Sequence, residues 1–329
     1  MTTKDQFLML LEEAGDSYVS GEQAAFELQV SRTAVWKAVE ALRKDGIRVD
    51  AVRNKGYKLA GPVDVLSEAG IKKWLGGGQH SIIPDIHFQR TVTSTNTILK
   101  NMAADGAKEG YVLAAGNQTA GKGRAGRSFY SPSETGVYLS ILLRPSDCDA
   151  GRASRFTTMA AVAACEAIEM IAEETAAIKW VNDVYTDGRK VAGILTEAAI
   201  DLESGQLDYA VLGIGFNVYE PEGGFPEEIC QRAGCILKEK TEEAKNRLAA
   251  AFVDRFLFYC DTETGGERMR YVRQYQKRCF VPGKLINVLS GGVNTPAKAL
   301  YVDDECRLIV QYEDGLKEAL SAGEVSIRV

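Results

Sequence analysis

The segment GNQTAGKGRAGRSF, residues 116–129, carries four glycines, three cations and no acidic residue. Glycines let backbone N–H groups approach a ligand closely, and cations attract anions, so the pattern predicts a loop that wraps an anion. It is not a Walker A loop, because Lys122 is followed by glycine rather than by Ser or Thr. Gly121, Gly123 and Gly126 match GxGxxG, but a lone match is weak evidence for a dinucleotide site.

A second cation stands where a strand is predicted to begin. The segment IKWVNDVYTDGRKVAGILTEA, residues 178–198, has a hairpin-type turn at Asp187-Gly188, followed by Lys190 and then Gly193 in an apolar run. A lysine that enters an apolar strand is costly to bury unless an anion meets it. The alternative is a surface lysine at a strand end.

Two further segments combine small and polar residues near predicted strands. YAVLGIGFNVY (209–219) predicts a strand interrupted by Gly213 and Gly215, which is typical of a close approach by a ligand or backbone. TVTSTN (91–96) ends in TSTN, which places three hydroxyls and an amide after a strand, where they cap a helix or bind a ligand. GVYLSILLRP (136–145) predicts an apolar strand to which we assign no chemistry.

The charge of the first sixty residues is strongly uneven, although the whole chain has a net charge of −6. Residues 1–30 carry one base and six acids, a net of −5, whereas residues 31–58 carry eight bases and three acids, a net of +5. A basic block in an acidic protein indicates a polyanionic partner.

The same region has the pattern of a DNA-binding motif. SGEQAAFELQVSRTAVWKAVEALRKDG predicts two helices, capped by Ser20 and Ser31, and IRVDAVRNKGYKLA predicts a hairpin. Together they predict a winged helix-turn-helix whose second helix enters the major groove, with Arg43 also on its exposed face. The alternative is a small protein-interaction domain with a solvated basic face. The predicted DNA contacts are Ser31, Arg32, Thr33, Trp36, Lys37, Arg53 and Lys55.

Length and composition define the class of protein. A chain of 329 residues, 45% hydrophobic and 26% charged, predicts a soluble globular protein of two or three domains. It has no apolar run of about 18 residues and no signal-peptide pattern, so we expect no membrane partner. Seven dispersed cysteines predict reduced thiols in the cytoplasm. His80 and His87, the only histidines, are expected on a surface or turn.

Six segments in order resemble the catalytic domain of biotin protein ligases. They are TSTN, QTAGKGRAGRSF, SPSETGVYLS, KWVNDVY, RKVAGILTE and GIGFNV, within residues 91–218. The winged helix in front and the C-terminal stretch ending DGLKEALSAGEVSIRV resemble the bifunctional type that also represses the biotin operon. The resemblance spans essentially the whole chain.

The resemblance implies a multidomain α/β fold. Residues 1–62 would form the winged helix-turn-helix, and residues 63–278 an α/β catalytic domain with a mixed sheet, similar to class II synthetases. From Phe280 on, short alternating segments predict strands, and residues 279–329 would form an SH3-like small β-barrel.

It also implies the chemistry. In such enzymes the biotin carboxylate attacks the α-phosphate of ATP, with Mg²⁺, to give biotinyl-5′-AMP and pyrophosphate. A lysine of a biotin carboxyl carrier protein domain, part of a biotin-dependent carboxylase, then attacks the mixed anhydride. The further partners implied are operator DNA and a second copy of the chain, in a homodimer promoted by ligand.

The roles of individual residues follow from the same resemblance. Lys190 and Arg124 would be catalytic. The biotin-binding residues would be Ser94, Thr95, Asn96, Gln118, Lys122, Gly123, Arg124, Lys190, Gly193, Gly213 and Gly215. The residues that bind ATP or the adenylate would be Arg127, Phe129, Lys179, Asn182, Asp183 and Asn217. Asp183 would also reach the metal through Mg-ATP, and residues 219–237 would form a flexible loop over the nucleotide.

Alternatives remain open for some of these residues. Asp183 could equally be a turn residue, and Arg127 a structural anchor of its loop. The chain departs from the family's usual pattern at Lys122, Ala125 and Phe129, where arginine, arginine and tryptophan are common, and at Val181, where proline is common. These departures bear on the affinity for adenine.

Two rival functions fit parts of the pattern. A lipoate protein ligase shares the adenylation chemistry, but it would need a long apolar channel, and the winged helix argues against it. A repressor that senses biotin without transferring it would not need Lys190 and Arg124, which the chain retains.

Overall fold

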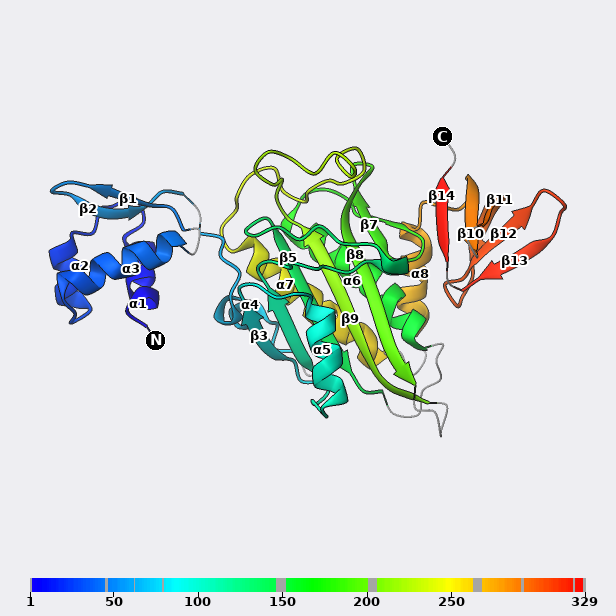
Figure 1. The fold of residues 1–329 in the computed structure, drawn as a ribbon, viewed down its shortest axis with the longest axis horizontal. Coiled ribbons are helices and arrows are strands. Elements are labelled where there is room, and N and C mark those ends of the chain that lie inside the picture. The colour runs from blue at the N-terminus through cyan, green and yellow to red at the C-terminus, as the bar shows by residue number, and fades with distance from the viewer. Residues whose placement is uncertain are drawn as a thin grey trace. The chain divides into compact units, whose positions relative to one another are not determined.

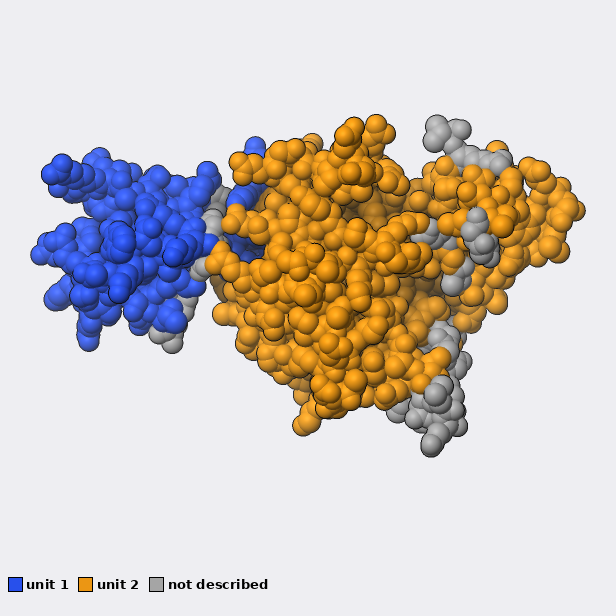
Figure 2. Space-filling view, in the orientation of Figure 1, with its two compact units in different colours: residues 1–66, 239–246 blue, residues 67–238, 247–329 orange. Residues whose placement is uncertain are grey.

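The computed structural model describes residues 2–44, 47–61, 63–78, 80–145, 152–200, 206–262, 268–290, 293–321 and 323–327. The chain divides into two compact units, residues 1–66 with 239–246 and residues 67–238 with 247–329 (Figure 2). The domain boundaries predicted after residues 62 and 278 stay a prediction. Over the described ranges, no helix is both long enough and apolar enough to cross a membrane.

The first unit is a winged helix-turn-helix, as predicted. Its elements are α1 (Thr3–Ala14), α2 (Gly21–Glu27), α3 (Arg32–Lys44), β1 (Val49–Val52) and β2 (Gly56–Leu59) (Figure 1). Both predicted caps are present: Ser20 Oγ accepts from Gln23 N at 3.0 Å, and Ser31 Oγ accepts from Ala34 N at 3.1 Å. These bonds satisfy N–H groups that have no partner within their helices.

The core of this unit comes from one face of each helix. Val35, Val39 and Leu42 follow one another at spacings of four and three on α3, and all three are buried against α1 residues such as Phe7 and Leu11. That spacing leaves the opposite face of α3 in solvent, where Arg32, Trp36 and Lys37 lie.

The second unit is built on a seven-stranded mixed sheet, in the order β3-β4-β5-β9-β8-β7-β6. Only β3 and β4 are parallel among its pairings. Helix α5 covers one face, and α6 and α7 cover the other (Figure 1). The strands are β3 (Asp85–Gln89), β4 (Tyr111–Ala115), β5 (Gly136–Leu143), β6 (Ala177–Lys179), β7 (Asp183–Thr186), β8 (Arg189–Ile200) and β9 (Leu207–Asn217). The helices are α4 (Glu68–Trp74), α5 (Thr95–Ala104), α6 (Arg152–Ile171), α7 (Ala244–Thr262) and α8 (Arg268–Arg278).

The C-terminal segment forms the small antiparallel β structure that the sequence predicts. Its sheet has five strands in the order β13-β12-β11-β10-β14. They are β10 (Leu285–Ser290), β11 (Val293–Val302), β12 (Leu308–Tyr312), β13 (Lys317–Leu320) and β14 (Glu324–Ile327). Every pairing in this sheet is antiparallel, so short hairpin connections can link successive strands.

Candidate active site and nucleic-acid interface

The register of three neighbouring strands gathers small residues on the face that α5 covers. Gly215 of β9 lies opposite Gly193 of β8 and Tyr138 of β5. Two residues earlier in β9, Gly213 lies opposite Ser140 of β5. Because side chains alternate between the two faces of a sheet, these positions share a face. The three strand glycines predicted to bind biotin are therefore neighbours, whereas the fourth, Gly123, lies in the glycine-rich loop.

Phe129 uses the space that two of these glycines leave. A Cβ atom on Gly215 would lie 2.3 Å from Cε1 of the Phe129 ring, and one on Gly193 would lie 3.1 Å from Cε2. The ring also makes an edge-to-face contact with Tyr138, with 6.4 Å between centroids. Only glycine at 215 lets the Phe129 ring rest on the sheet.

The TSTN segment meets the glycine-rich loop through Gln118. Ser94 caps α5, and its Oγ accepts from Thr97 N at 3.5 Å. The backbone N–H of Thr95 donates to Gln118 Oε1 at 2.9 Å. Gln118 Nε2 in turn donates to Ser131 Oγ at 3.0 Å. The bond between Thr95 and Gln118 thus joins two residues, far apart in sequence, that are both predicted to bind biotin.

Asn96 lies one residue further, at the start of α5. Its Nδ2 donates to the carbonyl oxygen of Leu195 at 3.2 Å and to Glu197 Oε2 at 3.0 Å. Its Oδ1 accepts from Ser140 Oγ at 2.6 Å. A Cβ atom on Gly213 would lie 1.9 Å from Asn96 Oδ1, so a larger residue there would displace the amide.

Lys190 is ion-paired rather than isolated. Its Nζ lies 2.6 Å from Asp183 Oδ1, and the two side chains are 32% and 22% exposed. Its backbone N–H donates to the carbonyl of Arg232 at 2.8 Å, and its carbonyl accepts from Gly234 N at 2.9 Å. The segment predicted to cover the nucleotide is thus hydrogen-bonded to the backbone of the lysine predicted to act on its phosphate.

Arg124 is joined to the same KWVND segment. Arg124 Nη1 donates to Asn182 Oδ1 at 3.0 Å, and Asn182 Nδ2 donates to the carbonyl of Ile194 at 2.8 Å. The Trp180–Val181 peptide bond is cis. The hydroxyl of Tyr275, on α8, donates to the carbonyl of Val181 at 3.0 Å. Both predicted catalytic cations therefore contact adjacent residues, Asn182 and Asp183.

The glycine-rich loop folds back on itself. Gly123 N donates to the carbonyl of Arg127 at 2.7 Å, and Phe129 N donates to the carbonyl of Gly121 at 2.9 Å. The side chains of Lys122 and Arg127, where these bonds close the loop, are exposed. These bonds fix the backbone from which the two cationic side chains extend.

Asn217 and Lys179, also predicted to bind the nucleotide, lie near the residues that contact Lys190. Asn217 ends β9 and donates from Nδ2 to the carbonyl of Gly234 at 3.1 Å. Lys179 ends β6 and is opposite Asp183 in the β6–β7 register.

A cavity of about 170 Å³ opens on the α6 side of the sheet. Its lining shares only Arg124 with the residues predicted to bind ligand.

Several polar residues of the site were missed from the sequence. Ser140 lies in the strand to which no chemistry was assigned, yet its hydroxyl contacts Asn96 and, at 2.7 Å, Thr95 Oγ1. Lys100 Nζ contacts Glu197 Oε1 at 2.7 Å. A serine in the middle of an eight-residue buried strand was the available signal, because a buried hydroxyl needs a partner.

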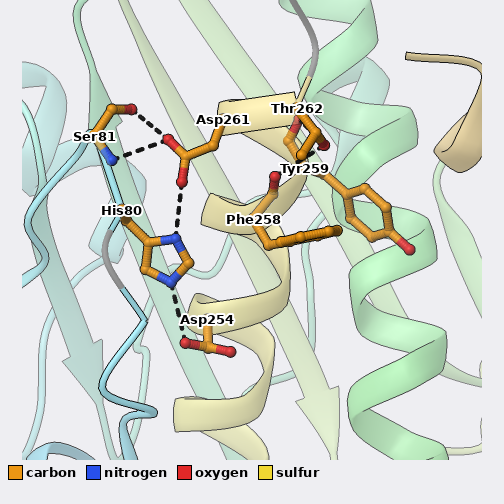
Figure 3. A network of polar contacts seen from close by, with 7 residues as sticks. All are labelled: His80, Ser81, Asp254, Phe258, Tyr259, Asp261 and Thr262. Carbon is orange, nitrogen blue, oxygen red and sulfur yellow. Dashed lines mark hydrogen bonds and ion pairs between the residues drawn. The ribbon is translucent and has the colours of Figure 1, made fainter. Parts of the chain in front are cut away.

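The environment of His80 also differs from the expected surface or turn. Its Nδ1 lies 2.9 Å from Asp261 Oδ2, and its Nε2 lies 3.0 Å from Asp254 Oδ1, both on α7 (Figure 3). Ser81 binds the other oxygen of Asp261. Burial lowers the pKa of His80, but the two carboxylates raise it more, so that its pKa lies above the ordinary value.

The side chains of the predicted DNA contacts are all exposed. Ser31, at the N-terminus of α3, and Arg53 and Lys55, at the tip of the wing, are exposed, and Trp36 of α3 is 54% exposed. Arg43 is an exception to the expected free face, because its guanidinium donates to the carbonyl of Val49 and fixes the wing to α3. The exposed residues in the first two turns of α3 are Arg32, Thr33, Trp36 and Lys37.

Three family profiles match successive parts of the chain. The first, described as an HTH domain, matches residues 3–58. The second, described as the biotin/lipoate A/B protein ligase family, matches residues 87–217. The third, described as the biotin protein ligase C-terminal domain, matches residues 283–328. Two relatives match most of their own length. The bifunctional ligase/repressor BirA of Bacillus spizizenii is 34% identical, covering 98% of both chains. The biotin–[acetyl-CoA-carboxylase] ligase of Mycobacterium tuberculosis is 32% identical, covering 70% of this chain and 85% of its own.

The chain belongs to the family of bifunctional biotin protein ligase/repressors. It is a biotin protein ligase that carries the helix-turn-helix of a repressor.

Solved structures of biotin protein ligases share the fold. A mutant ligase from Aquifex aeolicus in complex with biotin aligns with a TM-score of 0.61 at 25% identity, over 74% of this chain and 98% of its own. The ligase of Leishmania major in complex with biotinyl-5-AMP aligns with a TM-score of 0.50 at 25% identity, over 73% of this chain and 99% of its own.

Proposed function

We propose that this chain joins biotin to ATP as biotinyl-5′-AMP and then transfers the biotinyl group to a lysine of a biotin carboxyl carrier domain. The observation that carries the proposal is the convergence of Lys190 and Arg124 on Asp183 and Asn182. The titles of related structures name biotin and biotinyl-5-AMP as bound ligands, which supports these substrates.

The first step needs cations more than it needs an acid or a base. A biotin carboxylate oxygen attacks the α-phosphorus of ATP, and the bond to the β-phosphate oxygen breaks to release pyrophosphate. Two anions must approach, and negative charge develops on the phosphoryl oxygens. Lys190 and Arg124 would stabilise that charge. Asp183 would hold the Lys190 ammonium in place until the phosphate arrives.

The second step transfers the acyl group. The neutral amine of the carrier lysine attacks the carbonyl carbon of the anhydride, loses a proton, and expels AMP. The glycine-rich loop, which carries Lys122 and Arg127, would lie over the anhydride and keep water from it.

Magnesium is proposed as the metal of this site, where it would neutralise phosphate charge. Mg²⁺ in nucleotide sites is commonly held by one or two carboxylates together with the phosphates. The carboxylate of Asp183 fits that donor set, and Phe129, Lys179 and Asn217 would surround the nucleotide.

The polar cluster of Thr95, Asn96 and Gln118 would favour biotin over lipoate. A ureido group has one carbonyl acceptor and two N–H donors, whereas a lipoyl dithiolane has neither. A site that hydrogen-bonds its substrate rejects an analogue that leaves its buried polar groups unpaired. Ser94, Gly193, Gly213 and Gly215 would complete this site.

The second function that we propose is biotin-responsive repression. The exposed face of α3 and the wing tip supply the cations and amphipathic side chains that a groove reader needs. The protein would bind an operator as a homodimer promoted by the adenylate, with one half-site for each copy. The dispersed cysteines suit a protein that works in the reducing cytoplasm.

An ATP–pyrophosphate exchange assay tests the enzymatic proposal. We expect exchange that depends on biotin and not on lipoate. Exchange driven by lipoate would favour the lipoate ligase, and the absence of exchange with either acid would favour a sensor without catalysis. A footprint on operator DNA tests the repressor, and protection of a single half-site would contradict the dimer.

A further inference from the structure

The side-chain amide of Asn96 is held by three fixed partners. Its nitrogen binds the carbonyl oxygen of Leu195 and a carboxylate oxygen of Glu197, and its oxygen accepts from Ser140. Asn96 is 3% exposed, so water cannot easily replace a lost partner. Any change in these partners therefore acts on the amide itself.

Two of these partners decide which way the amide points. The carbonyl of Leu195 and the ionised carboxylate of Glu197 can only accept hydrogen bonds. If the amide turned by 180°, its oxygen would face both of these oxygens, and repulsion would replace two hydrogen bonds. In the observed orientation the Asn96 oxygen keeps a second lone pair beyond the one that Ser140 uses.

Lys100 keeps the carboxyl group of Glu197 ionised, so that it can only accept hydrogen bonds from Asn96. Its Nζ lies 2.7 Å from the carboxylate oxygen that Asn96 does not use. Burial raises the pKa of Glu197, but the bonds from Lys100 and Asn96 lower it more, so that the net pKa lies below the ordinary value. At neutral pH the group is an acceptor only. A protonated carboxyl could instead donate to a turned amide.

We propose that Glu197, held by Lys100, is a positioning residue that makes Asn96 accept a hydrogen bond from an N–H group of the substrate. The inference rests on the proposed function, because the ureido group of biotin is the substrate part with N–H donors. Glu197 acts through Asn96 and does not itself touch the substrate. The pair thereby sets the preference of the site for a ureido compound.

The test measures ATP–pyrophosphate exchange by the full-length protein. Glu197→Gln is expected to raise the KM for biotin about tenfold, on the scale of one buried hydrogen bond. Its new amide cannot accept from both Asn96 and Lys100 as the carboxylate does. Lys100→Met is expected to raise the same KM about threefold, because the carboxylate survives but loses its counter-charge. The KM for ATP should change less than twofold in both, and the exposed Glu173→Gln serves as the matched control.

A double-mutant cycle with Asn96→Ala separates positioning from a general structural effect. If Glu197 acts through Asn96, Glu197→Gln should change the KM for biotin less than twofold when Asn96 is already alanine. Lys100→Met in the same two backgrounds carries the test if Glu197→Gln does not fold. An unchanged KM in Glu197→Gln, an equal rise in the KM for ATP, or the same factor in both backgrounds would overturn the positioning role. Absence of biotin-dependent exchange in the wild-type protein would instead overturn the proposed function, and this inference with it.

Discussion

The exposed face of α3 and the buried cluster around Asn96 at the start of α5 use polar side chains in opposite ways. Arg32, Trp36 and Lys37 extend into solvent from a helix whose other face is buried. Asn96 and Ser140, in contrast, are buried and hydrogen-bonded to one another before any ligand arrives. Side chains of the first kind can adapt to a partner, whereas those of the second kind are held in one arrangement before any partner arrives.

This difference has a consequence for mutation. A side chain exposed on α3 can be removed without leaving a buried partner unpaired, so the loss should be confined to DNA binding. A side chain removed from the buried cluster leaves its partners unsatisfied, and the loss should spread to substrate affinity and stability.

Removal of residues 1–62 should abolish operator binding, because every predicted DNA contact is deleted. A truncated chain that begins at Val63 keeps the bonds from Glu243 N to the Val63 carbonyl and from Lys245 N to Asp64. We therefore expect ATP–pyrophosphate exchange to persist. Gel-shift titration at several salt concentrations is the measurement. The intact protein should lose affinity steeply as salt rises, and operator binding that survives the deletion would contradict the winged-helix assignment.

Lys190→Ala should reduce adenylate formation at least tenfold, about 1.4 kcal/mol or more in the barrier. The reciprocal variant, Lys37→Ala, should weaken operator binding and leave exchange unchanged, because Lys37 is exposed on α3. The exchange rate and the operator affinity are measured for both variants, and each variant is expected to lose only one of the two. Wild-type adenylation in Lys190→Ala would remove this lysine from the mechanism.

Gly215→Ala should weaken ATP binding and lower the Tm, because its methyl group would overlap the Phe129 ring. Gly77→Ala is the matched control, since an added Cβ there meets nothing within 4 Å. Thermal unfolding and the KM for ATP are the two readouts. If both variants have the same Tm and the same KM for ATP, the position of the Phe129 ring against Gly215 contributes to neither stability nor ATP binding.

The contact of His80 with α7 should make a small, pH-dependent contribution to stability. Because the pKa of His80 is raised in the folded state, its contribution is fully present below the ordinary pKa of 6.5. It is lost as pH rises through the folded pKa. The difference in free energy of unfolding between wild type and His80→Gln should therefore shrink between mildly acidic and alkaline pH. A difference that grows with pH would contradict the charged pairing.

Local patterns were enough to predict the elements that carry the site. Ser20 and Ser31 were predicted as caps because an N-terminal hydroxyl followed by apolar spacing is a local signal. The turn at Asp187-Gly188 and the strand that begins beside Lys190 follow from residues adjacent in sequence. The family resemblance then supplied the roles that no periodicity encodes.

The contacts inside the site could not be predicted in the same way. Glu197 meets Asn96 across 101 residues of sequence, and His80 meets Asp254 across 174. Such pairs depend on strand register and helix packing, which a single sequence does not state locally. Ser140 was overlooked because its strand was classified as a whole, although a hydroxyl on a buried face required a partner.

The most direct test of the central claim is biotin transfer by this protein to a purified biotin carboxyl carrier domain, followed by mass spectrometry of the carrier. We predict that one carrier lysine gains a biotinyl group, that the gain requires ATP, and that Lys190→Ala slows it at least tenfold. A carrier that stays unmodified under these conditions, or that accepts lipoyl in place of biotinyl groups, would contradict the account.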